Sequence, residues 1–236
     1  GADAPFVRQR DVAAYVHGET GLDGPDLPPP NASPRSEHAV EFLAEHFRAH
    51  PEATLVAIGP LTNVGLAFAT HPGARPARIV LMGGAIGEGN RTPAAEFNIW
   101  ADPDAARRVC TSGLDVTMVG LDVTHQALFT RDECEAIRGR GVAGRLTAEL
   151  VDYYARAHPH MAGTPIHDAV AVAQVIDPSL LTLEHCHLEV DCGTVSRGRT
   201  LVDQFHVTGR EPNVHVATAI DPAFTAWMSE RIASLG

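Results

Sequence analysis

The chain lacks the features that mark several broad classes of protein. Its 236 residues hold no apolar run approaching the length of a membrane span, so we expect no membrane partner. The formal net charge of -11 argues against a surface that tracks phosphates, so we expect no nucleic-acid partner. Four cysteines in the whole chain suit a reducing cytoplasm better than a disulfide scaffold. The opening residues carry no apolar signal-peptide core, which also favours a cytoplasmic location.

Motifs for phosphate-bearing cofactors are missing as well. No G-x-G-x-x-G follows a predicted strand, and no P-loop occurs. These absences argue against an unrelated doubly wound nucleotide-binding domain, which nevertheless stays open as the weakest interpretation. The chain also has no cluster of aspartates that could complete a divalent-cation site.

One short segment resembles a zinc site in composition only. It contains His185, Cys186, His187 and Cys192, whose spacing fits no standard zinc pattern. Neighbouring residues of a strand point to opposite faces of the sheet, so these side chains cannot all converge on one ion. We therefore predict a sheet edge here. The two other cysteines, Cys110 and Cys134, fall in helical patterns and are predicted to be packing residues.

What is present is an alternation of strand and helix patterns. Strands are predicted over 54–58, 78–82, 115–121, 187–191, 201–207 and 214–219. Helices are predicted over 131–138 and 147–157. Further helices are predicted to begin at Ser33–Pro34, at Pro60, at Asp102–Pro103 (ending at about Cys110), at Thr164–Pro165 and at Asp221–Pro222 (ending at Ile232). The Gly- and Pro-rich stretch 18–34 is predicted to be a loop.

This pattern predicts an α/β fold with an open, doubly wound, mostly parallel sheet flanked by helices, and one domain over residues 1–236. The strands are continuously apolar, which indicates burial on both faces. In such a sheet, ligands bind outside the carboxyl ends of the strands. The polar loop 87–98 follows the strand 78–82, so we expect the site there.

The loop is rich in groups that can bind sugar hydroxyls: Glu88, Asn90, Glu96 and Asn98. In an extended backbone, residues two apart point the same way, so Glu96 and Asn98 are expected to reach one ligand, with Phe97 facing away or forming the pocket wall. Taken alone, the tripeptide is more typical of a solvated loop with a buried Phe, and it is its place in the predicted sheet that favours a ligand site. The segment therefore suggests a pocket for a polyol.

A second pair of candidates stands before an apolar helical pattern. Asp168 could give a hard oxygen to a cation, and His167 could protonate a leaving group. The structural alternatives are a carboxylate that complements the helix dipole and a hydrogen-bonded His. His17, before the loop, could equally be a surface residue, and Asn63 is expected to fix a helix start.

The motifs are more specific together than singly. V-A-I-G-P-L-T-N, V-L-M-G-G, E-G-N, A-E-F-N, D-P-D-A-A, M-V-G-L-D-V-T-H and I-H-D occur in this order. Over nearly the whole chain the sequence resembles the inosine-uridine-preferring nucleoside hydrolase family. That resemblance implies Ca²⁺-assisted hydrolysis of the N-glycosidic bond of ribonucleosides to ribose and free base, a place in purine or pyrimidine salvage, and a homo-oligomer, either a dimer or a tetramer.

The resemblance also implies roles for individual residues. It assigns the Ile58 carbonyl and the Asp168 carboxylate to calcium, and His167 to protonation of the leaving group. It places four residues in the ribose subsite and two near the nucleobase or pocket wall. These are Met82, Asn90, Glu96 and Asn98 for the ribose, and His17 and Phe97 for the base.

Two departures from the family pattern matter. The family opens with a strand ending in D-x-D-P-G-x-D-D, which supplies most calcium ligands and the base that activates water, and this motif is absent. We therefore expect a fold missing its first strand-helix unit, with unpaired strand edges that favour an oligomer or lower stability. Where related enzymes carry base-contacting tyrosines, this chain has His158 and His160, so the resemblance implies no base preference.

Calcium takes roughly 6–8 oxygens, more than Asp168, the Ile58 carbonyl and a substrate diol provide. By position, Asp122 is the best substitute for the missing base. We expect the full-length form to be a hydrolase and these 236 residues alone to be inactive. The alternative is a non-catalytic relative that binds ribosides or only assembles with partners. Genuine loss of the segment, a separate polypeptide and trimming are equally open as causes.

Overall fold

A computed structural model describes residues 1–11, 18 and 20–235 of the chain. The chain divides into two compact units. The first comprises Gly1–Arg10, Arg35–Thr124 and His167–Ala219, and the second comprises Asp11–Pro34, His125–Ile166 and Ile220–Gly236. All the predicted site residues except His17 belong to the first unit, and His17 lies outside the described residues.

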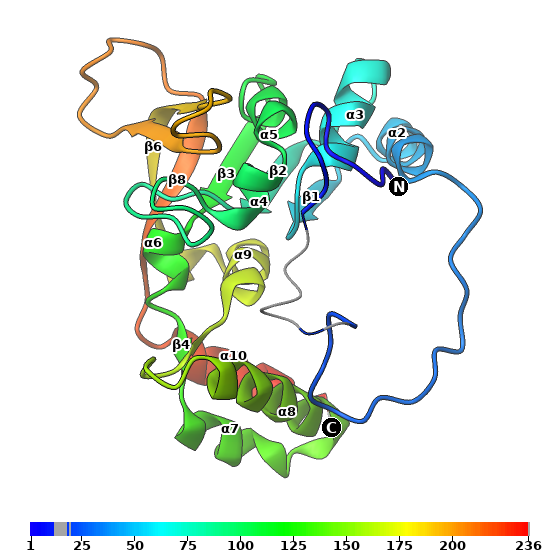
Figure 1. The fold of residues 1–236 in the computed structure, drawn as a ribbon, viewed down its shortest axis with the longest axis vertical. Helices are drawn as coiled ribbons and strands as arrows, with labels where there is room; N and C mark the ends of the chain where they lie inside the picture. The colour runs from blue at the N-terminus through cyan, green and yellow to red at the C-terminus, as the bar shows by residue number, and fades with distance from the viewer. Residues whose placement is uncertain (12–17, 19, 236) are drawn as a thin grey trace. The chain divides into compact units, whose positions relative to one another are not determined.

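The first unit is built on a six-stranded sheet with the order β1-β2-β3-β8-β6-β7 (Figure 1). In chain order the strands are β1 (Thr54–Ala57), β2 (Arg78–Met82), β3 (Asp115–Val119), β6 (Leu181–Val190), β7 (Thr200–Asp203) and β8 (Val214–Ile220). The pairs β1–β2, β2–β3 and β3–β8 are parallel, and β6–β7 is antiparallel. The predicted mostly parallel α/β sheet is therefore confirmed.

Helices of the first unit cover the sheet. They are α2 (Ala39–Ala49), α3 (Thr62–Thr70), α4 (Phe97–Ala101), α5 (Pro103–Cys110), α6 (Leu121–Thr124) and α9 (His167–Ile176), with a short 3₁₀ turn over Pro178–Leu180. α3 packs against α2 and α5, α5 packs against β6, and α9 packs against β2.

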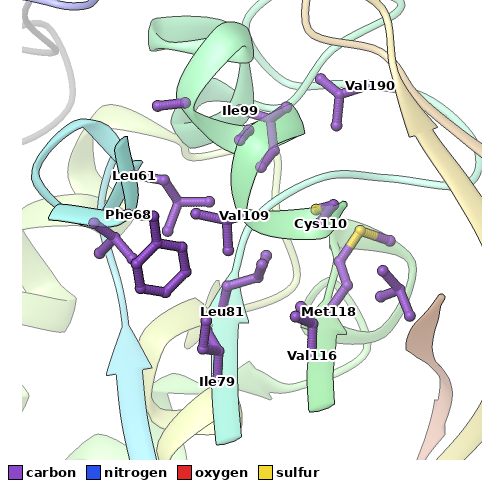
Figure 2. Packing of buried hydrophobic residues seen from close by; sticks show 14 of the residues in the cluster. Leu61, Phe68, Ile79, Leu81, Ile99, Val109, Cys110, Val116, Met118 and Val190 are labelled. Atoms are coloured by element: carbon purple, nitrogen blue, oxygen red, sulfur yellow. The ribbon is translucent and has the colours of Figure 1, made fainter. Parts of the chain in front are cut away.

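The central strands are buried along their length, as their continuous apolar sequences predict. Ile79 and Leu81 of β2 join Val116 and Met118 of β3 in one cluster (Figure 2). Residues of α3 and α5, and the residue that precedes α3, close this cluster from one side: Leu61, Phe68, Val109 and Cys110. Val80 alternates with Ile79 and Leu81 and is also fully buried, so β2 is covered on both faces. Because β1, β2 and β3 are parallel, their carboxyl ends lie at the same edge of the sheet.

Two helices begin later than the sequence predicts. α2 does not begin at Ser33–Pro34 but at Ala39, because the His38 ring accepts a hydrogen bond from Val40 N at 3.3 Å and so caps the helix. α3 begins at Thr62 rather than Pro60. By contrast, Asp102 caps α5 as predicted, since its carboxylate accepts from Ala105 N at 3.1 Å.

The C-terminal part of the chain also differs in detail. Thr164–Pro165 does not open a helix but forms β5, and α9 begins only at His167. β6 is longer than predicted and β7 shorter. Along β6, Cys186 is buried whereas His185 is exposed, so these neighbours do point to opposite faces, and within the described residues no group of three or more His, Cys, Asp or Glu could hold a metal.

The second unit is mostly helical. It contains α7 (Arg131–Arg138), α8 (Gly141–Ala157) and α10 (Phe224–Ala233), with a small antiparallel sheet of β4 (Leu128–Phe129) and β5 (Thr164–Pro165). A capping box between Thr130 and Glu133 starts α7. α7 packs against α8, and α10 packs against both. Residues 20–34 form no helix or strand, in agreement with the predicted loop.

Cys110 and Cys134 are buried free thiols, as predicted for packing residues. Burial raises the pKa of Cys134 to about 11, so this thiol is not a reactive nucleophile. In the part of the chain that the structure describes, no helix has the length and apolarity needed to cross a membrane.

Candidate active site

The loop predicted to carry the site begins with a glycine pair at the end of β2. Gly84 has φ +79°, and a Cβ there would lie 2.7 Å from Met118 Sδ and 2.9 Å from Thr200 Cγ2. Only glycine fits both the backbone conformation and this space. Gly84 O then accepts a hydrogen bond from Leu121 N at 2.9 Å, which ties the turn to the end of the neighbouring strand β3. The loop therefore leaves the sheet at its carboxyl edge.

Two side chains hold the first part of the loop. Asp122 accepts from Ile86 N at 2.6 Å through one carboxylate oxygen and from Gly87 N at 2.9 Å through the other. Thr200 Oγ1 accepts from Ala85 N at 2.9 Å and donates to Ala85 O at 2.6 Å. Three successive residues of the loop are thus fixed by side chains from β7 and α6.

Glu96 is the most deeply buried carboxylate of the candidate site, with 2% of its surface exposed. It caps α4. One oxygen accepts from Asn98 N at 2.8 Å, and the other accepts from Gly84 N at 3.0 Å and Ile99 N at 3.1 Å. Burial raises the pKa of Glu96, the three N–H groups oppose that rise, and the charge of Asp168 adds to it. That electrostatic coupling brings Asp168 into the same site as Glu96.

The predicted extended backbone at E-F-N is wrong, because Phe97–Ala101 is helix α4. Glu96 precedes the helix and Asn98 lies in its first turn, so they do not share a face as alternating strand residues would. Asn98 is nevertheless directed into the site: its Nδ2 donates to Met82 O at 3.1 Å. The structure therefore brings Met82, Glu96 and Asn98 together by a route that differs from the predicted one.

Asn90 and Phe97 are joined at the outer side of the loop. Asn90 Oδ1 accepts from Phe97 N at 2.9 Å, so it supplies a second acceptor at the start of α4. Asn90 is exposed and Phe97 is half-buried. Between these two residues the backbone of Gly89 packs closely against that of Ala95, since a Cβ at Gly89 would lie 2.2 Å from Ala95 O.

His167 and Asp168 form the first turn of α9. His167 is half-buried, and its Nδ1 lies 2.7 Å from the hydroxyl of Thr124, which is fully buried at the end of α6. Asp168 is exposed. Both residues lie in the helix that packs against β2.

Ile58 follows directly after β1. The register pairs Ala57 with Leu81, so the next residues, Ile58 and Met82, lie side by side at the carboxyl edge of the sheet. Ile58 is 48% exposed. Within the described residues β1 is the outermost strand of the sheet and pairs only with β2.

Several residues that shape the site are not predicted by the sequence. The guanidinium groups of Arg91 and Arg197 both lie over the Trp100 ring, at 4.4 Å and 3.9 Å from its centroid. Arg197 Nη2 also donates to Trp100 O at 2.8 Å. Arg197 and Thr200 come from a segment about a hundred residues further along the chain, so no local pattern could identify them. Thr124 stands within the quoted motif M-V-G-L-D-V-T-H, but nothing in the sequence marks its contact with His167.

A cavity of about 760 Å³ lies within the second unit. Its walls come from α7, α8 and the segment that follows α8, and they include Cys134, Tyr154 and His158. The rings of Tyr154 and His158 stack with centroids 4.2 Å apart. None of the predicted site residues lines this cavity.

Relatives of known function share the sequence over most of its length. The family model described as "Inosine-uridine preferring nucleoside hydrolase" matches residues 1–226. A pyrimidine-specific ribonucleoside hydrolase RihA from Citrobacter koseri is 43% identical, over 99% of this chain and 78% of the relative.

Solved structures agree with the sequence relatives. A purine-preferring ribonucleoside hydrolase from Gardnerella vaginalis has a TM-score of 0.89 at 34% identity, covering 98% of this chain and 78% of that one. A plant nucleoside hydrolase, PpNRh1, has a TM-score of 0.87 at 29% identity, covering 96% and 76%. The resemblance inferred from the motifs is thereby confirmed, and the chain belongs to the inosine-uridine preferring nucleoside hydrolase family.

Proposed function

We propose that this protein hydrolyses the N-glycosidic bond of ribonucleosides, releasing ribose and a free base. The observation that carries the proposal is the cluster at the carboxyl edge of the sheet. There a buried carboxylate, Glu96, and a buried carboxamide, Asn98, meet Met82 and are coupled electrostatically to Asp168. Family membership supports the same chemistry.

In this proposal the ribose is bound by Met82, Asn90, Glu96 and Asn98. A carboxylate has roughly four acceptor positions. Glu96 uses three of them on backbone N–H groups, which leaves one for a ribose hydroxyl. The three N–H groups also fix the carboxylate before substrate arrives, so binding would need little reorganisation.

Cleavage of a glycosidic bond develops positive charge on the sugar ring. The pKa of Glu96 is raised mainly because its carboxylate is buried, and Asp168 adds a second negative charge nearby. A cationic ribosyl centre beside Glu96 and Asp168 would be stabilised by both carboxylates, more strongly than the neutral substrate. This difference is what would lower the barrier.

The departing base must gain a proton, and we propose that His167 supplies it. An imidazole is suited to proton transfer near neutral pH. Thr124 engages the Nδ1 atom, so Nε2 is the nitrogen that we assign to the substrate. His17 and Phe97 are proposed to lie near the base or the pocket wall, and the structure describes only the second of these.

From the family resemblance we also propose calcium as a cofactor, with Asp168 and the Ile58 carbonyl as ligands. The donor set of the described residues does not complete such a site, because calcium takes roughly 6–8 oxygens and no group of three or more metal-binding side chains occurs among these residues. We therefore derive no step through the ion. If bound, calcium would hold the ribose diol and a water molecule.

Activation of water is not assigned to Asp122. Both of its carboxylate oxygens accept backbone N–H groups of the loop, from Ile86 and Gly87. We propose that Asp122 anchors the loop, and its role as the substitute base stays a prediction.

A second proposal is a protein that binds ribosides without cleaving them, or that only assembles with partners. The incomplete calcium shell of the described residues favours it, and the expected inactivity of these 236 residues on their own belongs to it. The relatives give that inactivity no support, since the Citrobacter koseri hydrolase matches 99% of the chain. It stays a prediction.

The setting of the reaction is proposed from the resemblance alone: nucleoside salvage in the cytoplasm by a homo-oligomer, dimer or tetramer. Light scattering coupled to size-exclusion chromatography would measure the oligomeric state. A mass equal to one chain of 25.1 kDa at micromolar concentration would contradict the oligomer.

The experiment that separates the two functions is release of ribose from inosine and uridine by the purified protein, with calcium and with EDTA. One purine and one pyrimidine nucleoside are needed because the RihA relative and the Gardnerella vaginalis enzyme differ in the base they prefer. Release above the substrate blank supports the hydrolase. Binding of both nucleosides by calorimetry, with no release, supports the second proposal.

A further inference from the structure

Thr124 and His167 make a short contact that joins two helices across 43 positions of sequence. Thr124 ends α6, has no exposed surface, and donates its own N–H to Gly120 O at 3.1 Å. His167 begins α9, which packs against α6. The distance of 2.7 Å between Thr124 Oγ1 and His167 Nδ1 is that of a strong hydrogen bond.

The Thr124 hydroxyl can either donate or accept in this hydrogen bond. When it donates to Nδ1, the neutral ring carries its proton on Nε2. When the ring is doubly protonated, the same hydroxyl accepts from Nδ1–H, and Nε2–H is the proton that the imidazolium can give to a leaving group. The ring that remains is neutral, with its proton on Nδ1 and still bonded to Thr124. The partner is therefore kept throughout a cycle of proton transfer, and the ring plane does not have to turn.

Burial fixes the geometry of the hydrogen bond between Thr124 and His167. Thr124 sits on a backbone fixed by the α6 turn, and its Oγ1 cannot exchange His167 for bulk water, because the side chain is fully buried. Where one nitrogen of an imidazole binds a metal, loss of the hydrogen bond to its other nitrogen typically lowers metal affinity or activity by about 10–100-fold. An acid that must reach one nitrogen of a leaving group has the same need for a fixed direction.

We propose that Thr124 is a positioning residue for His167: its hydroxyl stays hydrogen-bonded to Nδ1, fixes the orientation of the ring and so directs Nε2 towards the departing base. The inference rests on the proposed role of His167 as the acid. It adds a residue that does not touch substrate but decides whether the acid is correctly aimed.

Three variants test the inference, with Thr124→Ser as the matched control. Thr124→Val keeps the shape and removes the hydroxyl, whereas Thr124→Ser keeps the hydroxyl and removes a methyl. His167→Ala removes the acid itself. Each is assayed on inosine and on 4-nitrophenyl riboside, whose leaving group needs no proton.

We expect Thr124→Val to lower kcat for inosine about 10–100-fold, with KM little changed, and to leave turnover of the nitrophenyl riboside within about twofold. Thr124→Ser should retain most of the activity on both. A residue that only supports packing would slow both substrates alike. Equal losses on the two substrates, or a Ser variant as slow as the Val variant, would overturn the inference.

His167→Ala separates this inference from the proposed function. If that variant loses activity equally on both substrates, the acid role fails. If it loses activity on inosine only while Thr124→Val resembles wild type, the acid role stands and the positioning role fails.

A readout without turnover uses long-range ¹H–¹⁵N NMR of the imidazole nitrogens, with His167 assigned by its absence in His167→Ala. Wild type and Thr124→Ser should share one Nδ1 chemical shift, that of a hydrogen-bonded nitrogen, and this shift should move in Thr124→Val. An Nδ1 shift that is the same in wild type and the Val variant, or that moves as far in the Ser variant, would overturn the inference even if no nucleoside is cleaved.

Discussion

Thr200 and Ala85 are hydrogen-bonded to each other twice, although 115 positions separate them. The Thr200 hydroxyl accepts from Ala85 N at 2.9 Å and donates to Ala85 O at 2.6 Å. Both residues are buried, each with 2% of its surface exposed. One side chain of β7 thus satisfies both polar groups of a residue at the base of the candidate ribose-binding loop.

Replacing Thr200 by Val should therefore destabilise the protein. It would leave a buried N–H and a buried carbonyl without partners, at about 1–3 kcal/mol for each group. We expect the free energy of unfolding, measured with urea, to fall by about 2–6 kcal/mol. Thr200→Ser keeps the hydroxyl and should lose much less. Similar midpoints for the Val and Ser variants would show that the two hydrogen bonds contribute little.

Asp122 should act as an anchor of the loop. In Asp122→Ala, the amides of Ile86 and Gly87 lose their acceptors, so their hydrogen exchange should accelerate by about tenfold or more, the equivalent of about 1.4 kcal/mol. The amide of Gly65 in α3, bonded to Leu61 O, serves as the internal control. Unchanged exchange at 86 and 87 would remove Asp122 from the anchoring role.

The buried carboxyl of Glu96 gives a pH dependence of known sign. Its pKa is raised above the ordinary 4.5 in the folded protein, so between these two values the folded state binds more protons than the unfolded state. The free energy of unfolding must then fall as pH rises through that window.

Glu96→Gln has no titratable group at this position. It therefore removes the pH-dependent contribution of Glu96 to the free energy of unfolding, even if it also loses hydrogen bonds. The difference in unfolding free energy between wild type and Glu96→Gln, followed by urea titrations from about pH 4 upward, should therefore shift steadily against wild type as pH rises. The comparison uses the slope, not the absolute difference. A difference that moves in favour of wild type over this range would mean that the pKa is lowered instead.

Calcium should bind the described residues weakly. Asp168 offers one carboxylate and Ile58 one carbonyl, and such a small ligand set is typical of dissociation constants no tighter than about 10⁻⁴ M. Isothermal titration with calcium should show binding in this range or weaker, and Asp168→Ala should abolish it. Glu88→Ala, in the loop 87–98 and outside the proposed ligand set, is the control. Micromolar binding that survives Asp168→Ala would place the metal elsewhere.

Much of the sheet can be predicted because its signals are local. The sequence predicts the strand 78–82 with its observed bounds, and Asp102–Pro103 gives a capping pattern that acts within one turn. Predictions fail where a distant or lateral partner decides the structure. Thr164–Pro165 is a strand because it pairs with Leu128–Phe129, and no pattern near residue 164 shows that pairing.

The site can be predicted in composition but not in conformation. Glu96 and Asn98 stand out as candidates, yet the short helix that follows Glu96 does not, because it is stabilised by the Glu96 carboxylate at its own N-terminus. The residues that support the site, Thr124 and Thr200, reach it only through folding of segments 43 and 115 positions away. Single-sequence patterns carry no such information.

The most direct test of the proposed chemistry compares wild type and His167→Ala on inosine and on 4-nitrophenyl riboside, with calcium present. We expect wild type to release ribose from both, and the variant to lose about 10²–10⁴-fold on inosine while keeping most of its activity on the nitrophenyl riboside. No release of ribose by wild type from either substrate, or equal losses on the two in the variant, would contradict the proposed reaction and the role of His167 in it.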